Sequence, residues 1–171
     1  MFFYGINTEF DDYGENVKEN EKLDGIILIS DDDININKLF KYYLKTVFQG
    51  TVLSAFDGLD ALNICLNNSP DLIFLDINMP IIGGITVIKE LRAKNFSAPI
   101  IVITAYDTHL SQECYEAGAD IVISKPVTRQ EFINSLYKFF PTYSDPIIHC
   151  FPNSRDLLNP PNPYRKSIFE F

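Results

Sequence analysis

Five short runs of apolar residues recur between residues 26 and 124, and they constrain the fold more than any other feature of the sequence. They are IILIS (26–30), TVLSA (51–55), LIFL (72–75), IIVI (100–103) and IVIS (121–124). Most are apolar throughout and do not alternate with polar residues, which is typical of parallel strands covered by helices on both faces. Each run is therefore predicted to be a strand of one parallel sheet.

Segments with the spacing of amphipathic helices follow these runs. In the first, apolar side chains from Ile36 to Phe48 recur every three or four residues. Later helices are expected near residues 58–67, 84–95, 107–117 and 128–140. Thr128 and Glu131 have the spacing of a capping box, and Gly118 is expected to end the preceding helix. Alternating strands and helices with right-handed crossovers predict an α/β domain with helices on both faces of the sheet.

Length, charge and cysteine content limit the classes of function. The 171 residues suffice for one domain and hardly for two, and a net charge of −9 argues against nonspecific binding of nucleic acid. No apolar run approaches the roughly 20 residues of a membrane span, and the opening MFFY lacks the basic flank of a secretory signal. Three scattered cysteines without a CxxC pair indicate reduced thiols, so we expect a cytoplasmic protein.

Two extensions flank the predicted domain, which we place at residues 26–140. Residues 1–25 carry seven acids and two bases, and residues 141–171 hold six of the ten prolines with scattered apolar residues. We expect no separate effector domain in the C-terminal extension. Its apolar residues are expected to pack on the domain's own helical surface or on a second copy, which would make a homodimer, and output would be through protein contact.

Polar residues stand at the carboxyl ends of four predicted strands. Asp31, Asp32 and Asp33 follow the first strand, Asp76 the third, Thr104 the fourth, and Lys125 stands at the end of the fifth. The carboxyl ends of parallel strands meet at one edge, where ligands of open α/β sheets bind. Packed carboxylates repel one another, and a hard cation such as Mg²⁺ relieves this repulsion. A carboxylate beside a metal, an ammonium and a hydroxyl can accept a phosphoryl group.

These motifs, in this order, resemble the receiver domain of two-component response regulators. The resemblance covers about residues 26–140 and rests on ILISDDD, FLDINMPIIGG, IVITA and ISKPV, with AFDGLDAL at 55–62. It implies a flavodoxin-like, five-stranded parallel sheet in the order 2-1-3-4-5. It also implies that a histidine kinase or histidine phosphotransfer protein donates the phosphoryl group and that Mg²⁺ is the cofactor. The chain would then be a phosphoacceptor and not an enzyme, with at most self-phosphorylation and self-dephosphorylation.

The resemblance implies that Asp76 is the phosphoacceptor. Asp32 would bind Mg²⁺ directly, with Asp31 close by or acting through water. Asp76 itself and the backbone carbonyl of Asn78 would be the other ligands. Three consecutive aspartates leave the acidic pair open between 31/32 and 32/33. We favour 31/32, because IILIS then fills the strand without an aspartate in it.

The resemblance also assigns the residues around the phosphoryl group. Thr104 and Lys125 would each contact a phosphoryl oxygen, and the small Ala105 would leave room for the donor. Asn78 and Tyr106 would tune dephosphorylation by contacting the attacking water. The peptide bond between Lys125 and Pro126 would be cis.

Two positions depart from the family pattern. Gly83–Gly84 stands where an Asp-Gly pair is usual, which removes a carboxylate and keeps the turn. Val122 stands three residues before the lysine, where the family often has an aromatic residue that rotates inward on phosphorylation. We therefore expect the acceptor chemistry to be kept and the switch to be weak, as suits a phosphorelay.

Two other functions fit parts of the pattern. A Mg²⁺-dependent phosphatase with an aspartyl intermediate needs a second aspartate two residues after the nucleophile, where this chain has Asn78. A pseudo-receiver, which binds proteins without being phosphorylated, would have lost the acceptor, the acidic pair or the lysine, and all are present. The favoured prediction is a response regulator that acts as a signalling switch or phosphorelay intermediate. No motif specifies its kinase or its downstream protein target.

Overall fold

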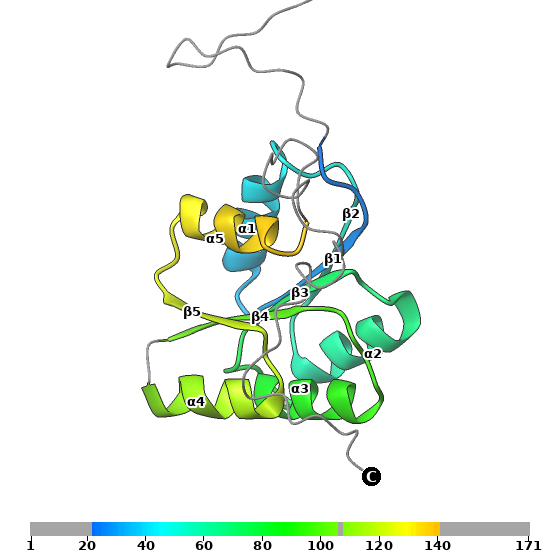
Figure 1. Ribbon diagram of the computed structural model, residues 1–171, viewed down its shortest axis with the longest axis vertical. Helices are drawn as coiled ribbons and strands as arrows, with labels where there is room; N and C mark the ends of the chain where they lie inside the picture. Colours follow the sequence, from blue (N-terminus) through cyan, green and yellow to red (C-terminus); the bar gives the residue numbers. More distant parts are fainter. Residues whose placement is uncertain (1–21, 106–107, 141–171) are drawn as a thin grey trace, which may run out of the picture.

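The computed structural model describes residues 22–105 and 108–140, in which strands and helices alternate (Figure 1). The strands are β1 (Ile26–Ser30), β2 (Thr51–Ala55), β3 (Leu72–Leu75), β4 (Ile100–Ala105) and β5 (Ile121–Lys125). The helices are α1 (Ile34–Leu44), α2 (Gly58–Asn68), α3 (Gly84–Ala93), α4 (Thr108–Ala117) and α5 (Arg129–Tyr137). All ten predicted elements are present, and β4 and β5 are slightly longer than their apolar runs.

The strands form one parallel sheet in the order β2-β1-β3-β4-β5, as predicted. Because the chain leaves β2 on one side of β1 and continues through β3 on the other, the strand order reverses between β1 and β3. In the register of these two strands, Ser30 pairs with Leu75. The residues that follow each of them, Asp31 and Asp76, are therefore neighbours at the point where ligands of such sheets bind.

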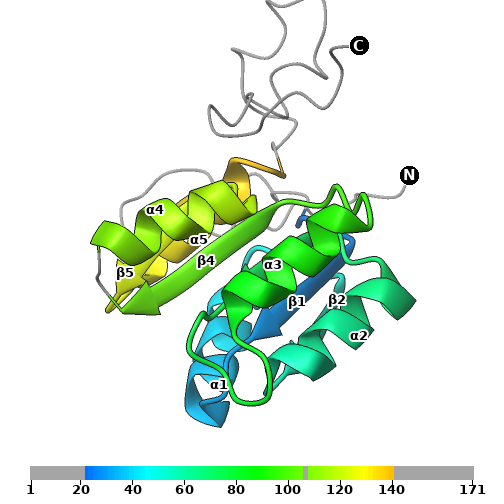
Figure 2. The same cartoon turned by 90° about the horizontal axis from the view of Figure 1, so that it is seen from below.

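Helices cover both faces of the sheet, α1 and α5 on one and α2, α3 and α4 on the other (Figures 1 and 2). The first layer contains a stack of aromatic rings, with Phe132 centred 4.6 Å from Phe40 and 4.2 Å from Phe74. All four residues of β3 are buried. Burial on both faces explains why the strands read as continuous apolar runs.

The first helix is shorter than its apolar pattern. The pattern continues to Phe48, whereas α1 ends at Leu44, and the Phe48 N–H bonds to the Leu44 carbonyl in the following turn. Phe48 is buried all the same in the hydrophobic cluster of this layer, next to the ring of Phe140, and its backbone pairs with Leu23 in an isolated parallel bridge. The helical spacing thus runs past the helix end. The bridge also joins Leu23, which we placed in the acidic extension, to the domain.

The other predictions about the extensions concern residues outside those described. Residues 1–21 and 141–171 lie outside the described residues. The packing of the C-terminal extension and the formation of a homodimer therefore remain predictions. Among the helices of the described residues, none has the length and apolar character needed to cross a membrane.

Two predicted helix ends are confirmed. The Thr128 hydroxyl accepts the Glu131 N–H at 3.2 Å, and the Glu131 carboxylate accepts the Thr128 N–H at 2.9 Å, which completes the capping box of α5. Gly118 follows α4 with a φ of +112°, in the region that only glycine adopts without strain.

Ile81, in the loop between β3 and α3, combines backbone strain with exposure. Its φ is +68° and its side chain is 70% exposed. A left-handed backbone costs most L-residues about 1–2 kcal/mol, and asparagine tolerates it better. We expect Ile81→Asn to raise the free energy of unfolding by about 1 kcal/mol in urea titrations. Ile34→Asn, at an exposed isoleucine without positive φ, is the control and should give no gain. Destabilisation by Ile81→Asn would contradict the strain argument.

Candidate functional site

The parallel ladder continues one residue beyond β1 and β3, and this positions the first two site residues. The Asp31 N–H bonds to the Ala55 carbonyl at 3.2 Å, and the Asp76 N–H bonds to the Ser30 carbonyl at 2.8 Å. Both aspartates therefore still follow the geometry of the sheet. Both residues are buried, with 2% and 5% of the residue surface exposed, respectively.

The aspartate triplet divides into three environments. Asp31 is buried, Asp32 is exposed, and Asp33 is the N-cap of α1, where its carboxylate accepts the Asn35 N–H at 2.7 Å. The Asp33 N–H in turn donates to Asp31 Oδ1 at 3.0 Å. The structure thus groups Asp31 and Asp32 with the site and uses Asp33 to begin the helix, which is the arrangement of the favoured 31/32 pair.

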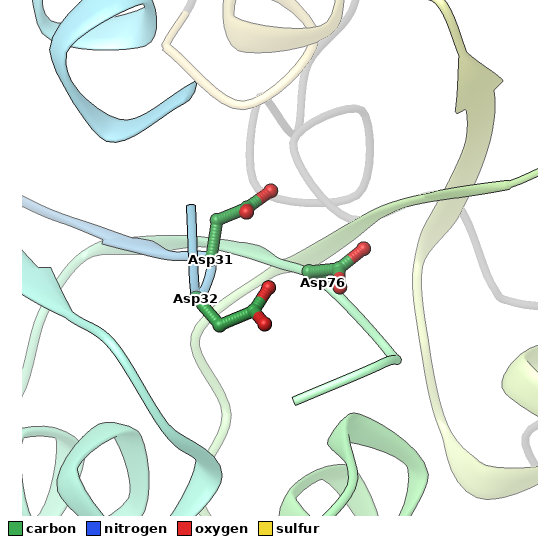
Figure 3. A group of neighbouring side chains, drawn as sticks. All are labelled: Asp31, Asp32 and Asp76. Atoms are coloured by element: carbon green, nitrogen blue, oxygen red, sulfur yellow. The ribbon is translucent and has the colours of Figure 1, made fainter. Parts of the chain in front are cut away.

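Three carboxylates gather at the reversal point of the sheet (Figure 3). Asp31, Asp32 and Asp76 each offer an oxygen, and these oxygens all lie within 4.8 Å of one another. Mg²⁺ prefers a few carboxylate oxygens and keeps several waters. Two buried carboxylates with one exposed carboxylate on the solvent side fit that preference, so the residues present fit a magnesium site.

Lys125 brings a positive charge to two of the carboxylates. Its ammonium lies 2.7 Å from Asp31 Oδ2 and 3.0 Å from Asp76 Oδ1. The side chain reaches this position from the last residue of β5, across the end of β4. The bond between Lys125 and Pro126 is cis, as the resemblance implied.

Burial and charge act in opposite directions on the ionisation of the site. Burial raises the pKa of Asp76 above its usual value, although Lys125 and the Asn78 N–H pull the pKa back down. Burial alone would lower the pKa of Lys125, but its hydrogen bonds to Asp31 and Asp76 outweigh burial and raise that pKa. Lys125 is therefore held in its charged form, while ionised Asp76 is costly without a further cation.

Thr104 supplies a hydroxyl group to the same edge of the sheet. It lies in β4, between the strands that lead to Asp76 and Lys125, and it is 1% exposed. Its hydroxyl oxygen has no hydrogen-bond partner among the described residues. An unpaired buried hydroxyl costs about 1–3 kcal/mol, so Thr104 offers an unused donor at this edge of the sheet.

The remaining predicted residues lie around the acceptor. The Asn78 N–H donates to Asp76 Oδ2 at 3.0 Å, and the Asn78 side chain is exposed. Ala105 is exposed at the end of β4, and Tyr106 lies outside the part of the chain that the structure describes. The turn with Gly83–Gly84 is present, with the Gly84 N–H bonded to the Ile77 carbonyl at 2.9 Å, and a Cβ on Gly84 would collide with the Asp76 carbonyl oxygen.

Two contacts near the site were not predicted. Asn37 is 2% exposed on the inner face of α1, and its amide donates to the Asp31 carbonyl at 2.7 Å, which fixes the acidic loop. The sequence did contain a signal for this contact, because Asn37 has the helical spacing of the buried residues Phe40 and Leu44. In addition, the Val122 N–H donates to the Tyr115 hydroxyl of α4 at 3.2 Å, so α4 bonds to β5 near the position that departs from the family pattern.

The family follows from a match over more than half of the chain. Residues 27–137 match the family described as the response regulator receiver domain. The chain belongs to the response regulator receiver family. Receivers are phosphoacceptor domains of two-component systems and bind Mg²⁺ at an acidic cluster, and in this receiver the corresponding cluster is that of Asp31, Asp32 and Asp76.

Curated relatives are similar to the receiver over only part of their own length. Response regulator MprA of Mycobacterium sp. (strain KMS) is 36% identical over 109 residues, which cover 63% of this chain and 46% of MprA. Hybrid signal transduction histidine kinase L of Dictyostelium discoideum is 38% identical over 134 residues, which cover 73% of this chain and 8% of the kinase. This chain therefore spans less than half of either relative.

Solved structures agree with the fold. The receiver domain of the Francisella response regulator 1452 is 35% identical, with a TM-score of 0.60, and the match covers 67% of this chain and 97% of that one. The CheX–CheY–BeF3–Mg²⁺ complex from Borrelia burgdorferi is 28% identical, with a TM-score of 0.61, over 66% of this chain and 86% of that one.

Mg²⁺ is expected to stabilise this receiver against unfolding near neutral pH. A ligand that binds only the folded state adds about 2.7 kcal/mol at a hundredfold excess over its dissociation constant. The melting temperature should therefore rise with millimolar Mg²⁺, and much less in Asp32→Asn, which removes the exposed carboxylate of the cluster. An equal rise in both proteins would place the binding of Mg²⁺ elsewhere.

Proposed function

We propose that this receiver accepts a phosphoryl group on Asp76 from a phosphohistidine of a kinase or histidine phosphotransfer protein. One observation carries the proposal: the buried Asp76 carboxylate lies next to two other carboxylates and pairs with the Lys125 ammonium where the strand order reverses. Val122, at the position often held by an aromatic residue, favours a relay of phosphate over a strong switch. Residues 26–140 would be the signalling domain between an acidic and a proline-rich extension.

The proposed metal ligands are those that the family resemblance implies, and the grouping of three carboxylates supports them. Asp31, Asp32, Asp76 and the carbonyl of Asn78 would hold Mg²⁺. When bound, the ion would neutralise charge on the carboxylates and on the transferring group. An exposed Asp32 leaves the cluster open to solvent, and therefore to an incoming donor.

The transfer itself needs an ionised Asp76. A carboxylate oxygen forms a bond to phosphorus while the bond from phosphorus to the donor's imidazole nitrogen breaks, and that nitrogen keeps the electron pair. Before transfer, one carboxylate oxygen of Asp76 faces Lys125 and the other accepts the Asn78 N–H. After transfer, Lys125 would pair with a phosphoryl oxygen, and the unpaired hydroxyl of Thr104 would donate to another.

Intact mass spectrometry of the full chain tests the proposal. Acetyl phosphate, a small phosphodonor, is added with Mg²⁺ or with a chelator. We expect a mass gain of one phosphoryl group in the first sample and none in the second. Absence of labelling in both would instead favour a pseudo-receiver that binds partners without being phosphorylated. Labelling that does not depend on the cation would contradict the role of the acidic cluster.

A further inference from the structure

The outward side of α1 is basic, although the chain as a whole has a net charge of −9. Lys38, Lys41 and Lys45 are exposed and recur at the three- and four-residue spacing that places side chains on one side of a helix. Ile34 and Tyr42 lie on the same side and are 51% and 66% exposed. These five residues are called the basic α1 face below. No acidic residue occurs between positions 34 and 56, and the nearest acids in sequence, Asp31, Asp32 and Asp33, precede the amino end of the helix.

A further cation lies next to this face. Arg129, the first residue of α5, is exposed and donates to the Thr46 hydroxyl at 2.6 Å, just beyond the end of α1. The acid in the first turn of α5, Glu131, is engaged in the capping box with Thr128. Arg129 therefore adds a cation beside the carboxyl end of α1, while the Glu131 carboxylate keeps its negative charge two residues further on in α5.

A segment of opposite charge joins the domain beside the same face. Residues 1–21 hold six acids and one base, and they also contain five aromatic residues. The described chain starts at Lys22, whose ammonium donates to the Lys45 carbonyl at 3.3 Å. The next residue, Leu23, bonds to the Val47 carbonyl through its N–H at 2.9 Å. The acidic segment is thus attached at the carboxyl end of α1.

We propose that residues 1–21 bind the basic α1 face of the same molecule. The carboxylates would lie opposite the lysines, and aromatic side chains of the segment would contact Ile34 and Tyr42. The 11 residues of α1 span about 16 Å, and the 13 residues from Glu9 to Glu21 reach about 40 Å when extended, so the acids can follow the whole face. A tether this short gives an effective concentration on the order of millimolar, which favours the intramolecular contact.

The proposal is independent of phosphoryl transfer and adds to it a neighbouring interaction surface. The face begins at Ile34, two residues after Asp32, so a bound segment lies beside the approach to the carboxylates. Other occupants, namely a second copy, nucleic acid or an acidic protein, compete with this assignment. The experiments below separate them from the acidic segment.

Zero-length crosslinking of the full chain with a carbodiimide tests the contact, because the reagent joins carboxylates to lysine amines without a spacer. We expect amide links from Glu9, Asp11, Asp12 or Glu15 to the three lysines of the face, within one molecule. Lys89, whose ammonium lies 3.8 Å from Glu113, serves as an internal positive control for the reaction. Links confined to dimers would assign the face to a second copy, and links that reach Lys94, the C-cap of α3, equally would show nonspecific attraction.

Lysine footprinting provides a second readout. In a variant of the full chain, Glu9, Asp11, Asp12, Glu15, Glu19 and Glu21 are changed to Gln or Asn, all outside the folded domain described above. Acetylation of Lys38, Lys41 and Lys45 should become about fivefold faster in this variant at low salt, and the difference should shrink as salt screens the charges. Lys89 and Lys94 are the matched controls and should change little.

Unchanged rates at the three lysines of the face would overturn the proposal and leave the face to a partner such as nucleic acid. An equal acceleration at all five lysines would also overturn it, because it would report only the change in net charge.

Discussion

Asp76→Asn is expected to leave the receiver without any phosphoryl group after incubation with acetyl phosphate and Mg²⁺. The amide has nearly the same shape as the carboxylate, but it is uncharged and is not a nucleophile for phosphorus at neutral pH. Intact mass spectrometry measures the loss directly. Glu90→Gln makes the same chemical change at an exposed position of α3 and should be labelled like the unmodified chain. Labelling of Asp76→Asn would move the acceptor to another residue.

The stability of this variant checks the electrostatics of the site. Because the pKa of Asp76 is raised in the folded state, folded protein binds a proton more readily than unfolded protein. Stability therefore falls as pH rises from the ordinary pKa of 3.8 through the raised value. Asp76→Asn lacks this loss, so without Mg²⁺ it should gain stability relative to the unmodified chain across that window. Urea titrations at several pH values measure the difference, and the opposite trend would mean that the folded state lowers the pKa.

Arg92→Ala is expected to destabilise the fold by about 3 kcal/mol, in the range for breaking a largely buried ion pair. The Arg92 guanidinium donates to the carbonyls of Gly118, Phe96 and Ala98, and to the Asp120 carboxylate at 2.8 Å. Both charged side chains are 15% exposed. Alanine would leave these acceptors without their donor, and would leave the Asp120 carboxylate with the Ile100 N–H and no cation.

Two variants separate charge from geometry in this network. Lys89→Ala breaks the exposed pair with Glu113, whose side chains are 60% and 53% exposed, and should cost less than about 0.5 kcal/mol. Arg92→Lys keeps the charge without the planar set of donors, so it should lie between the two alanine variants. Urea denaturation at one pH compares all three. An Arg92→Ala loss as small as that of Lys89→Ala would show that water replaces the network.

The sequence predicted the elements and the edge on which the site lies, because apolar runs and strand-end residues are local signals, whereas the strand order came from the resemblance to the receiver family. It left the division of the aspartate triplet open, since a helix cap and a metal ligand can use the same residue type. Tertiary contacts decided the rest. Leu23 forms its bridge with Phe48, which is distant in sequence, and the Asn37 amide turns back to the Asp31 carbonyl six residues earlier, a contact that no local pattern specifies. The positive φ of Ile81 was unexpected, because isoleucine is among the residues least suited to it.

The positive charge of Lys125 also determines which ionic charge the three carboxylates can best accommodate. With all groups ionised, three carboxylates and one ammonium leave two negative charges, which a divalent cation cancels. A monovalent ion would leave an excess negative charge, and a trivalent ion would reverse the sign. Conversion of a carboxylate into an acyl phosphate adds only about one further negative charge at neutral pH. The magnesium-loaded site would therefore stay within about one charge of neutrality in both the unphosphorylated and the phosphorylated state. Replacement of Lys125 by an uncharged residue would leave three negative charges, and the site would then favour an ion of higher valence.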